Sequence, residues 1–343
     1  MAFDGISSNE LPDYDIVEFS CGSFDGTAEL TIRCYGKQFH IQVSAKNLDD
    51  GSEFKCNFQR LLRRLDDPTY PEGDGDTDPM EDLCFWIAYN CNSQMRDLAS
   101  PCLSQLHTLK DWLILETVIL TMTMKDGQVA TIVSPPDPSL VANLIHQMEL
   151  PFSFQSLNIP TLDPSTITLR VGPEQTRPTE VSFGSDRFFF KATCSYSHAI
   201  REISILLRLK ELGLIHVVHS PILHGFVLSP DDSNKICGYL LEYIEHRDTL
   251  SGVEVKDEPL SVRTEWVRQL GDMIGALHKA DIIWGDAKPD NVLVDTDNNL
   301  RLIDFGGGHT YGWVDEDKAE TVEGDKQALL RMTAFLTTGE RPN

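Results

Sequence analysis

The chain has 343 residues, of which 41% are hydrophobic and 24% are charged, and its formal net charge at pH 7 is −24. This composition is typical of a globular protein and excludes a disordered chain, and the length allows two domains with separate cores. The acidity argues against nucleic acid and anionic membranes as partners, because both are themselves negatively charged.

The chain lacks the sequence features of an exported or membrane protein. Its start, "MAFDGISSNELPDYD", has neither a basic region nor an apolar run, and no stretch reaches the length of a membrane span. The eight cysteines form no CxxC pair and no Cys/His zinc spacing, so we expect reduced thiols. We therefore expect a cytoplasmic or nuclear protein with no signal peptide and no transmembrane segment.

Alternating apolar residues predict two β-hairpins in the first half of the chain. The stretch "TAELTIRCYGKQFHIQVSA" turns at "YGKQ", and "ETVILTMTMKDGQVATIVS" turns at Asp126–Gly127. Apolar residues at helical spacing in "PSLVANLIHQM" (138–148) predict a short helix. This half contains no catalytic motif, and we expect residues 1–155 to form a separate α+β region of unknown function.

Between these hairpins lies a stretch rich in Pro, Gly and Asp, "DDPTYPEGDGDTDPMED", which predicts an exposed loop over 66–82. Asp74, Asp76 and Asp78 resemble the start of a calcium-binding loop. The sixth position of that loop, however, is Pro79 instead of glycine. This departure argues against calcium binding.

The second half of the chain has a different order of predicted elements. "LPFSFQSLNIPTLDPSTI" (150–167) has three prolines and no sustained period, which predicts a domain boundary. After it, "TEVSFGSDRFFFKAT" predicts two strands, and "SHAIREISILLRLKELG" predicts a helix that Gly213 can end. "ILHGFVLS" and "ICGYLLEYI" predict two more strands, and "TEWVRQLGDMIGALHKA" predicts a second helix.

Two motifs suited to phosphoryl transfer follow this second helix. "DIIWGDAKPDNVLVD" contains Asp286, Lys288 and Asn291 in D-x-K-x-x-N spacing, and "LIDFGGG" contains Asp304 in an Asp-Phe-Gly triplet. Transfer of a γ-phosphoryl group requires oxygen ligands for Mg²⁺, a cation near the phosphates and a base that orients the attacking hydroxyl. "NVLVDTDNNLRLI", between the motifs, predicts a hairpin that returns the second aspartate close to the first.

With these motifs in this order, the region resembles the protein kinase-like superfamily, in a truncated and divergent Ser/Thr-type form. The resemblance covers about residues 165–343 and is specific because several independent signals occur in the right sequence. It implies an α+β, two-lobed kinase-like domain over 160–343. Its N-lobe would be a small antiparallel sheet (about 165–246), and its helical C-lobe (about 255–343) would be truncated after the long central helix.

The resemblance also implies roles for the motif residues, with ATP and Mg²⁺ as cofactors. Asp286 matches the catalytic base that accepts the proton of the attacking hydroxyl. Lys288 matches the cation beside the γ-phosphate, and Asn291 and Asp304 match the metal ligands. Asp325, in "EGDKQALLRM", resembles a buried aspartate that holds the backbone of the catalytic loop, although a plain helix N-cap is the alternative.

Further matches lie in the predicted N-lobe and would bind the nucleotide. Lys191 matches the lysine that contacts the α- and β-phosphates, and Glu202 matches its ion-pair partner on the following helix. "LLEYI" resembles the hinge, in which Leu241 would line the back of the pocket and Glu242 to Ile244 would face the adenine base. Taken singly, a lysine at a strand end or a helical glutamate is usually a solvated surface charge.

The sequence departs from the kinase pattern in four places. Trp284 and Gly285 replace the His and Arg before the catalytic aspartate, so we expect no dependence on a phosphorylated activation segment. No G-x-G-x-x-G loop precedes the phosphate-contacting lysine, and Gly172 is followed directly by Pro173. The activation segment is short and has no A-P-E triplet. Because the chain ends at Asn343, we expect the later C-lobe helices to be missing.

These features favour an ATP- and Mg²⁺-dependent phosphotransferase that resembles protein Ser/Thr kinases and transfers the γ-phosphate to a hydroxyl, because every metal and base residue is present. The missing glycine loop leaves a second interpretation, a catalytically weak or inactive pseudokinase that serves as a binding or scaffold module. A third is a small-molecule kinase, since "WGD" resembles the H-G-D triplet of antibiotic and choline kinases, although Lys288 favours the protein-kinase branch. The sequence does not define a protein substrate or partner.

Overall fold

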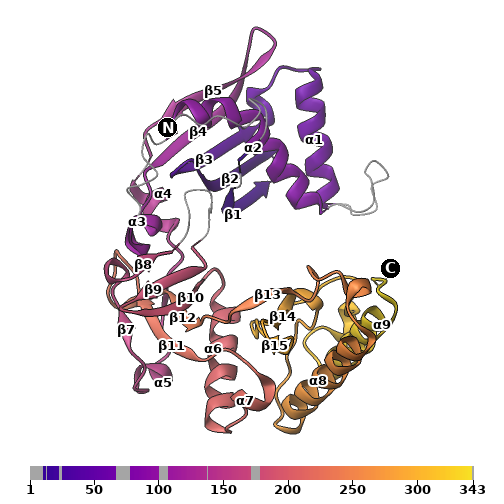
Figure 1. Ribbon diagram of the computed structural model, residues 1–343. Helices are drawn as coiled ribbons and strands as arrows, with labels where there is room; N and C mark the ends of the chain where they lie inside the picture. The colour runs from indigo at the N-terminus through magenta and orange to yellow at the C-terminus, as the bar shows by residue number, and fades with distance from the viewer. Residues whose placement is uncertain are drawn as a thin grey trace. The chain divides into compact units, whose positions relative to one another are not determined.

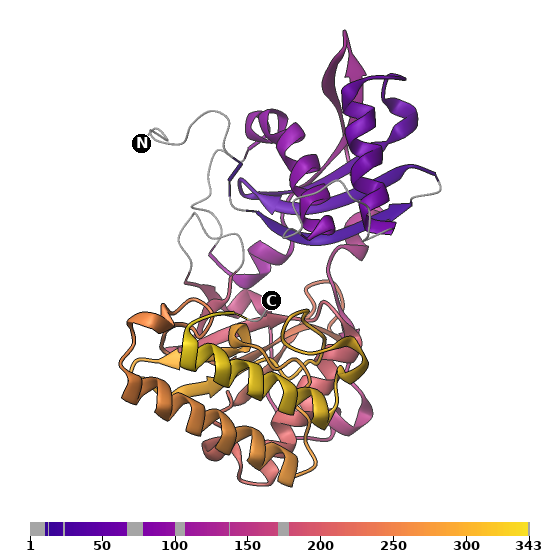
Figure 2. The same cartoon turned by 90° about the vertical axis from the view of Figure 1, so that its right-hand side faces the viewer.

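The computed structural model divides the chain into two compact units with mixed α+β structure (Figures 1 and 2). The N-terminal unit comprises residues 1–145 and 164–179, and the C-terminal unit comprises 146–163 and 180–343. The residues that the structure describes are 11–12, 14–22, 25–66, 78–99, 107–136, 138–170 and 178–341. No helix within these ranges has the length and apolar character needed to cross a lipid bilayer.

The N-terminal unit contains a five-stranded sheet in the order β1-β2-β3-β4-β5. Both predicted hairpins are confirmed, because β2–β3 and β4–β5 pair antiparallel, whereas β3 and β4 run parallel. The strands of the sheet are β1 (Asp15–Gly22), β2 (Thr27–Cys34), β3 (Lys37–Ser44), β4 (Thr117–Lys125) and β5 (Gln128–Ser134). Its other elements are η1 (Ala45–Asn47), α1 (Glu53–Asp66), α2 (Pro79–Asp97), α3 (Leu109–Leu113), α4 (Pro138–Asn143), η3 (Pro164–Thr166) and β8 (Thr168–Leu169).

One face of this sheet forms a core with α1 and α2. The alternating residues Leu30, Ile32, Phe39 and Ile41 are fully buried in one cluster with apolar residues of both helices. The side chains between them in the same strands therefore point to the opposite face, as the period of two requires. The core thus explains the alternation that the sequence shows.

The loop predicted over 66–82 extends too far, because α2 begins at Pro79. Asp78 caps this helix: its side chain accepts a hydrogen bond from the backbone N–H of Met80 at 2.7 Å. An Asp N-cap followed by Pro at the first helical position is a strong helix start, so Asp78 has a structural partner. Asp74 and Asp76, the other aspartates of the considered calcium loop, lie outside the described residues.

The helix predicted over 138–148 is too long. Helix α4 ends at Asn143, and β6 (Met148–Glu149) pairs with the strand β12, with Met148 opposite Ile236. Met148 is buried in the core of the C-terminal unit. The single helical period therefore breaks at the end of α4, where the chain continues into a strand of the C-terminal unit.

The C-terminal unit combines a larger sheet, a smaller three-stranded sheet and long helices (Figure 1). Within this unit, strands follow the order β7-β11-β12-β10-β9, with β6 beside β12, and a smaller sheet has the order β13-β14-β15. The strands are β6 (Met148–Glu149), β7 (Thr161–Leu162), β9 (Glu180–Phe183), β10 (Asp186–Ala192), β11 (Leu223–Leu228), β12 (Lys235–Glu242), β13 (His246–Thr249), β14 (Val292–Asp295) and β15 (Leu300–Leu302).

The helices of this unit include the two predicted from apolar spacing. They are α5 (Phe152–Gln155), α6 (Tyr196–Glu211), α7 (Ile215–Val218), η4 (Val255–Asp257), α8 (Leu260–Lys279), η5 (Pro289–Asn291), η6 (Glu316–Lys318) and α9 (Val322–Thr338). Helices α8 and α9 lie side by side (Figure 2). The predicted apolar face of α8 is confirmed, since Trp266, Leu270, Met273, Ile274 and Leu277 are all buried.

Candidate active site

A lysine and two carboxylates form a cluster where β10, α6 and the Asp-Phe-Gly triplet meet. Lys191 Nζ lies 2.7 Å from Glu202 Oε2 and 2.9 Å from Asp304 Oδ1. The side chain of Glu202 is 1% exposed, whereas that of Asp304 is 42% exposed. Glu202 therefore anchors Lys191 from inside the fold, and Asp304 is the carboxylate that remains accessible to a ligand.

Glu202 also has two partners that are not lysine. The Tyr239 hydroxyl donates to Glu202 Oε2, and the backbone N–H of Phe305 donates to Oε1 at 3.4 Å. Burial raises the pKa of Tyr239, and the Glu202 carboxylate raises it further, so the phenol keeps its proton and acts as a donor. Tyr239 was not among the predicted site residues. It stands directly opposite Lys191 in the β10–β12 pairing, a register that the sequence does not show.

The charges of the cluster shift the pKa values of its members. Burial works to lower the pKa of Lys191, but the carboxylates of Glu202 and Asp304 outweigh it and raise the pKa above its ordinary value. Burial works to raise the pKa of Asp304, and the Lys191 ammonium outweighs it, helped by the Gly306 N–H and the charge of Lys288. The pKa of Asp304 is therefore lowered, and at neutral pH the cluster is an ammonium between two carboxylates.

The second predicted cluster surrounds Asp286. Lys288 Nζ lies 2.8 Å from Asp286 Oδ2, and Asn291 Nδ2 donates to the same oxygen at 3.1 Å and to the Asp286 carbonyl at 2.8 Å. Thr310 completes the group, because its hydroxyl donates to Asp286 Oδ1 at 2.9 Å and accepts from Lys288 Nζ at 2.8 Å. The three predicted residues thus lie together, and Thr310 is an addition that sequence spacing did not indicate.

The hairpin predicted between the two motifs is confirmed and brings their backbones together. Strands β14 and β15 pair antiparallel, with Val292 opposite Leu302. Directly after β15, the N–H of Ile303 donates to the carbonyl of Asn291 at 3.0 Å. Asp304 follows in the left-handed region with φ of 55°. This conformation is unusual for a residue with a side chain and often occurs where function fixes the backbone.

The donor set of these two clusters suits Mg²⁺ bound together with phosphates. The side-chain N–H group of Asn291 donates to Asp286. Within the described residues, no hydrogen-bond donor contacts the side-chain oxygen of Asn291, which is therefore available to a metal ion. Asp304 adds a half-exposed carboxylate. No three His, Cys, Asp or Glu side chains of the described ranges converge into a metal site of their own. Mg²⁺ in kinases is held by one or two protein oxygens plus the nucleotide, so the residues fit a metal that arrives with ATP.

Asp325 holds the start of the catalytic loop, as the sequence predicted. It is 2% exposed, and its carboxylate accepts hydrogen bonds from the N–H groups of Trp284 at 2.8 Å and Gly285 at 2.9 Å. His278 Nε2 lies 2.9 Å from the same carboxylate. Trp284 is itself fully buried and donates its indole N–H to the carbonyl of Ile303 at 3.1 Å. Trp284 is therefore a packing residue at the start of this loop.

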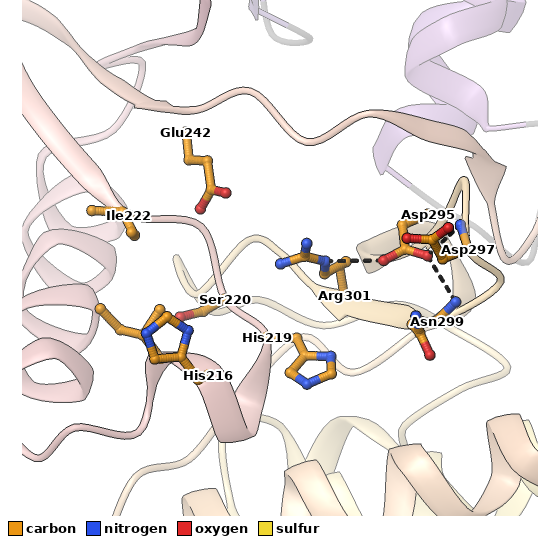
Figure 3. Close-up of a pocket in the computed structure, with 10 residues that line it drawn as sticks. His216, His219, Ser220, Ile222, Glu242, Asp295, Asp297, Asn299 and Arg301 are labelled. Carbon is orange, nitrogen blue, oxygen red and sulfur yellow. Dashed lines mark hydrogen bonds and ion pairs between the residues drawn. The ribbon is translucent and has the colours of Figure 1, made fainter.

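The predicted hinge residues lie at the end of β12, which stops at Glu242, and directly after it. Leu241 and Ile244 are buried. The side chain of Glu242 instead lines a separate pocket of about 380 Å³ (Figure 3). This pocket mixes carboxylates with cationic and polar groups, and its other lining residues are Ile215, His216, His219, Ser220, Ile222, Asp295, Asp297, Asn299 and Arg301. A contact between the hinge and adenine would therefore use the backbone of these residues, and it stays a prediction. Gly172 and Pro173, of the expected degenerate glycine loop, lie outside the described residues.

Comparison with known proteins agrees with this geometry. Residues 190–326 match the family model of the protein kinase domain. The chain is 37% identical over 79 residues to the serine/threonine-protein kinase PKH3 of Eremothecium gossypii, which covers 22% of this chain and 10% of that protein. It is 35% identical over 107 residues to the KEOPS complex subunit Bud32 of Pyrococcus abyssi, which covers 31% of this chain and 43% of that protein.

A third relative is a probable serine/threonine-protein kinase of Dictyostelium discoideum, with 31% identity over 103 residues, 29% of this chain and 6% of that protein. The chain thus spans less than half the length of each of these relatives. The fold, the ordered motifs and the matched segment together define the C-terminal unit as protein kinase-like. The superfamily predicted from the motifs is therefore confirmed.

Proposed function

We propose that the C-terminal unit is an ATP- and Mg²⁺-dependent phosphotransferase that transfers the γ-phosphate to a hydroxyl group. The observation that carries this proposal is the position of Lys191, which Glu202 and Asp304 hold between them at 2.7 and 2.9 Å. A lysine held in this way presents a fixed ammonium to the nucleotide phosphates, while the half-exposed Asp304 can accept a metal. Two relatives, a serine/threonine-protein kinase and a probable one, support a protein hydroxyl as the acceptor.

The residues of the two clusters would have separate roles in binding the nucleotide, holding the metal and activating the acceptor hydroxyl. Lys191 binds the α- and β-phosphates and keeps its contact with Glu202. Asn291 and Asp304 would hold Mg²⁺, which when bound neutralises charge on the phosphates. Asp286 orients the acceptor hydroxyl and takes its proton, and Lys288 stabilises charge on the γ-phosphate oxygens.

One observation favours the alternative of a weak or inactive pseudokinase. Both carboxylate oxygens of Asp286 already have partners, since Thr310 donates to Oδ1 and both Lys288 and Asn291 contact Oδ2. An acceptor hydroxyl must share or displace Thr310 before Asp286 can act as its base. If this exchange is unfavourable, the unit would bind Mg-ATP and transfer phosphate slowly or not at all.

Binding of Mg-ATP is tested by thermal unfolding of the wild type and of Asp304→Asn. Ligand at 100 times its Kd stabilises the folded state by about 2.7 kcal/mol, which is about 5–10 °C for a unit of this size. We expect this shift in the wild type with Mg-ATP and a much smaller one in Asp304→Asn or with EDTA. No shift in the wild type would contradict the proposal.

The acceptor is tested by incubation with γ-labelled ATP and a mixture of proteins and metabolites. Label on protein that disappears in Asp286→Ala supports the proposed protein kinase activity. Label confined to small molecules would instead support the small-molecule kinase interpretation. Nucleotide binding without any label would support the pseudokinase interpretation.

A further inference from the structure

An arginine from helix α6 occupies the space beside Gly285, which stands where the kinase pattern has its own arginine. A methyl group added to Gly285 would lie 2.5 Å from Arg201 Nη2 and 3.0 Å from Arg201 Cζ. Gly285 also has a φ of +96°, a conformation that side-chain-bearing residues rarely adopt. The backbone here is therefore shaped to admit the guanidinium of Arg201.

Arg201 connects three separate segments of the unit. Its Nη2 donates to the carbonyl of Ile283 at 2.9 Å, and its Nη1 donates to the carbonyl of Trp284 at 3.0 Å and to that of Phe305. A guanidinium has five donors in a fixed planar fork, so one side chain can satisfy all three carbonyls. Because Arg201 precedes Glu202 on α6, these bonds fix the helix that carries the partner of Lys191.

The segment after Asp-Phe-Gly closes on the same place through its own glycines and carboxylates. Gly307 has a φ of +84°, and a methyl group added there would lie 2.3 Å from Glu320 Oε1 and 3.1 Å from Arg201 Nη1. The Gly308 N–H donates to Glu320 Oε1 at 3.0 Å. Further along, Asp315 lies 2.8 Å from Arg331 of α9. Carboxylates of the segment itself therefore make the contacts that fix it.

We propose that Arg201 is a positioning residue that holds α6, the 283–285 loop and Phe305 together, so that the Lys191 cluster assembles without phosphorylation of residues 306–321. The structural part of this proposal is independent of the proposed function, whereas its effect on catalysis rests on that function. Arg201 thus substitutes, from a different element, for the arginine that Gly285 replaces. Its partners are backbone carbonyls, which no kinase or phosphatase can remove.

The structural part is tested by hydrogen exchange of the unliganded protein, read on peptides covering 303–308. Arg201→Met keeps the length of the side chain and removes every donor. We expect at least tenfold faster exchange in Arg201→Met and an intermediate effect in Arg201→Lys, because an ammonium cannot reach three carbonyls at once. Arg208→Met is the matched control, since Arg208 on the same helix donates to the Ala280 carbonyl at 2.7 Å, outside the clusters. Equal exchange in Arg201→Met and Arg208→Met would overturn the proposal.

A second variant covers the case in which Arg201→Met does not fold. Gly285→Ala places its methyl group against the guanidinium and should displace it, so exchange at 303–308 should again rise at least tenfold. Unchanged exchange at 303–308 in a folded Gly285→Ala protein would count against the positioning role of Arg201.

The catalytic part is tested by the kinetics of the same variants. We expect kcat to fall at least tenfold in Arg201→Met and less in Arg201→Lys, because Lys191 and Asp304 lose their fixed positions. Phosphatase treatment of the wild type should change the transfer rate less than twofold. A tenfold gain on phosphorylation of residues 306–321 would refute the proposal. If the wild type transfers no phosphate at all, the proposed function fails. The exchange measurement still tests whether Arg201 holds the three segments together.

Discussion

The buried carboxylate of Glu202 offers the most informative perturbation of the kinase-like unit. It holds Lys191 at 2.7 Å, accepts the Tyr239 hydroxyl and accepts the Phe305 N–H at 3.4 Å. Glu202→Ala removes all three interactions at once. Glu202→Gln keeps the volume and an acceptor for Tyr239 but removes the charge. Comparing the two variants therefore separates the effect of the ion pair from that of the buried hydrogen bonds.

The magnitude follows from what each partner loses. Lys191 keeps Asp304 at 2.9 Å, so the loss of its bond to Glu202 costs about 1–2 kcal/mol. The Tyr239 hydroxyl is left buried without its partner, which costs about 1–3 kcal/mol. We therefore expect Glu202→Ala to destabilise the unit by about 3–4 kcal/mol, within the usual range for breaking a buried ion pair. Glu202→Gln should cost about 1–2 kcal/mol.

Differential scanning calorimetry measures this difference. For a unit of about 180 residues, each kcal/mol lowers the melting temperature by about 2–4 °C, so Glu202→Ala should melt about 6–16 °C lower than the wild type. Glu211→Gln, at the exposed end of the same helix, is the control and should stay within about 0.5 kcal/mol. If Glu202→Ala melts like Glu211→Gln, then Glu202 does not anchor the cluster and the reasoning is wrong.

Three further predictions concern other buried or charged groups. Asp325→Ala should cost about 3 kcal/mol in urea unfolding because two loop N–H groups lose their acceptor; wild-type stability would refute this role. The pKa of Asp304 is lowered, so the stabilisation from its carboxylate should be lost as the pH falls through that lowered value, below 3.8. The pKa of Lys191 is raised, so the stabilisation from its ammonium should be lost as the pH rises through that raised value, above 10.5. The difference in melting temperature between the wild type and Lys191→Met should therefore stay constant between these limits, and a step near neutral pH would contradict it. Burial raises the pKa of Cys91 to about 12, so a thiol reagent at pH 8 should label exposed Cys56 and spare Cys91 until the protein unfolds; early labelling of Cys91 would show that its region opens.

Much of the kinase-like unit was predictable because its signals are local. The hairpin between Asn291 and Asp304, the apolar face of α8 and the N-terminal position of Asp325 in α9 are each set by spacing within a short stretch of chain. The pairing of Lys191 with Glu202 followed from the resemblance to kinases, because taken singly either residue is usually a surface charge.

Contacts between distant parts of the chain were not predictable. Arg201 and Phe305, which are hydrogen-bonded, lie 104 residues apart in the sequence. The hydrogen-bonded pairs Tyr239–Glu202 and Thr310–Asp286 are separated by 37 and 24 residues. No periodicity encodes such pairs, because they depend on how the elements pack. Helix α1 is a different case: its buried Phe58, Leu61 and Leu62 stand at helical spacing, so the sequence does carry a local signal for this helix.

The clusters around Lys191 and Asp286 are proposed to transfer phosphate together, and a measured transfer rate tests this most directly. The unmodified protein should move label from γ-labelled ATP to protein at about 1–100 per second, the range of active kinases. Asp286→Asn should lower this rate at least a hundredfold, whereas Asp290→Asn, whose carboxylate accepts from Ser251 at 2.8 Å, should not change it. Equal rates in the wild type and Asp286→Asn, or no transfer by either, would contradict the account.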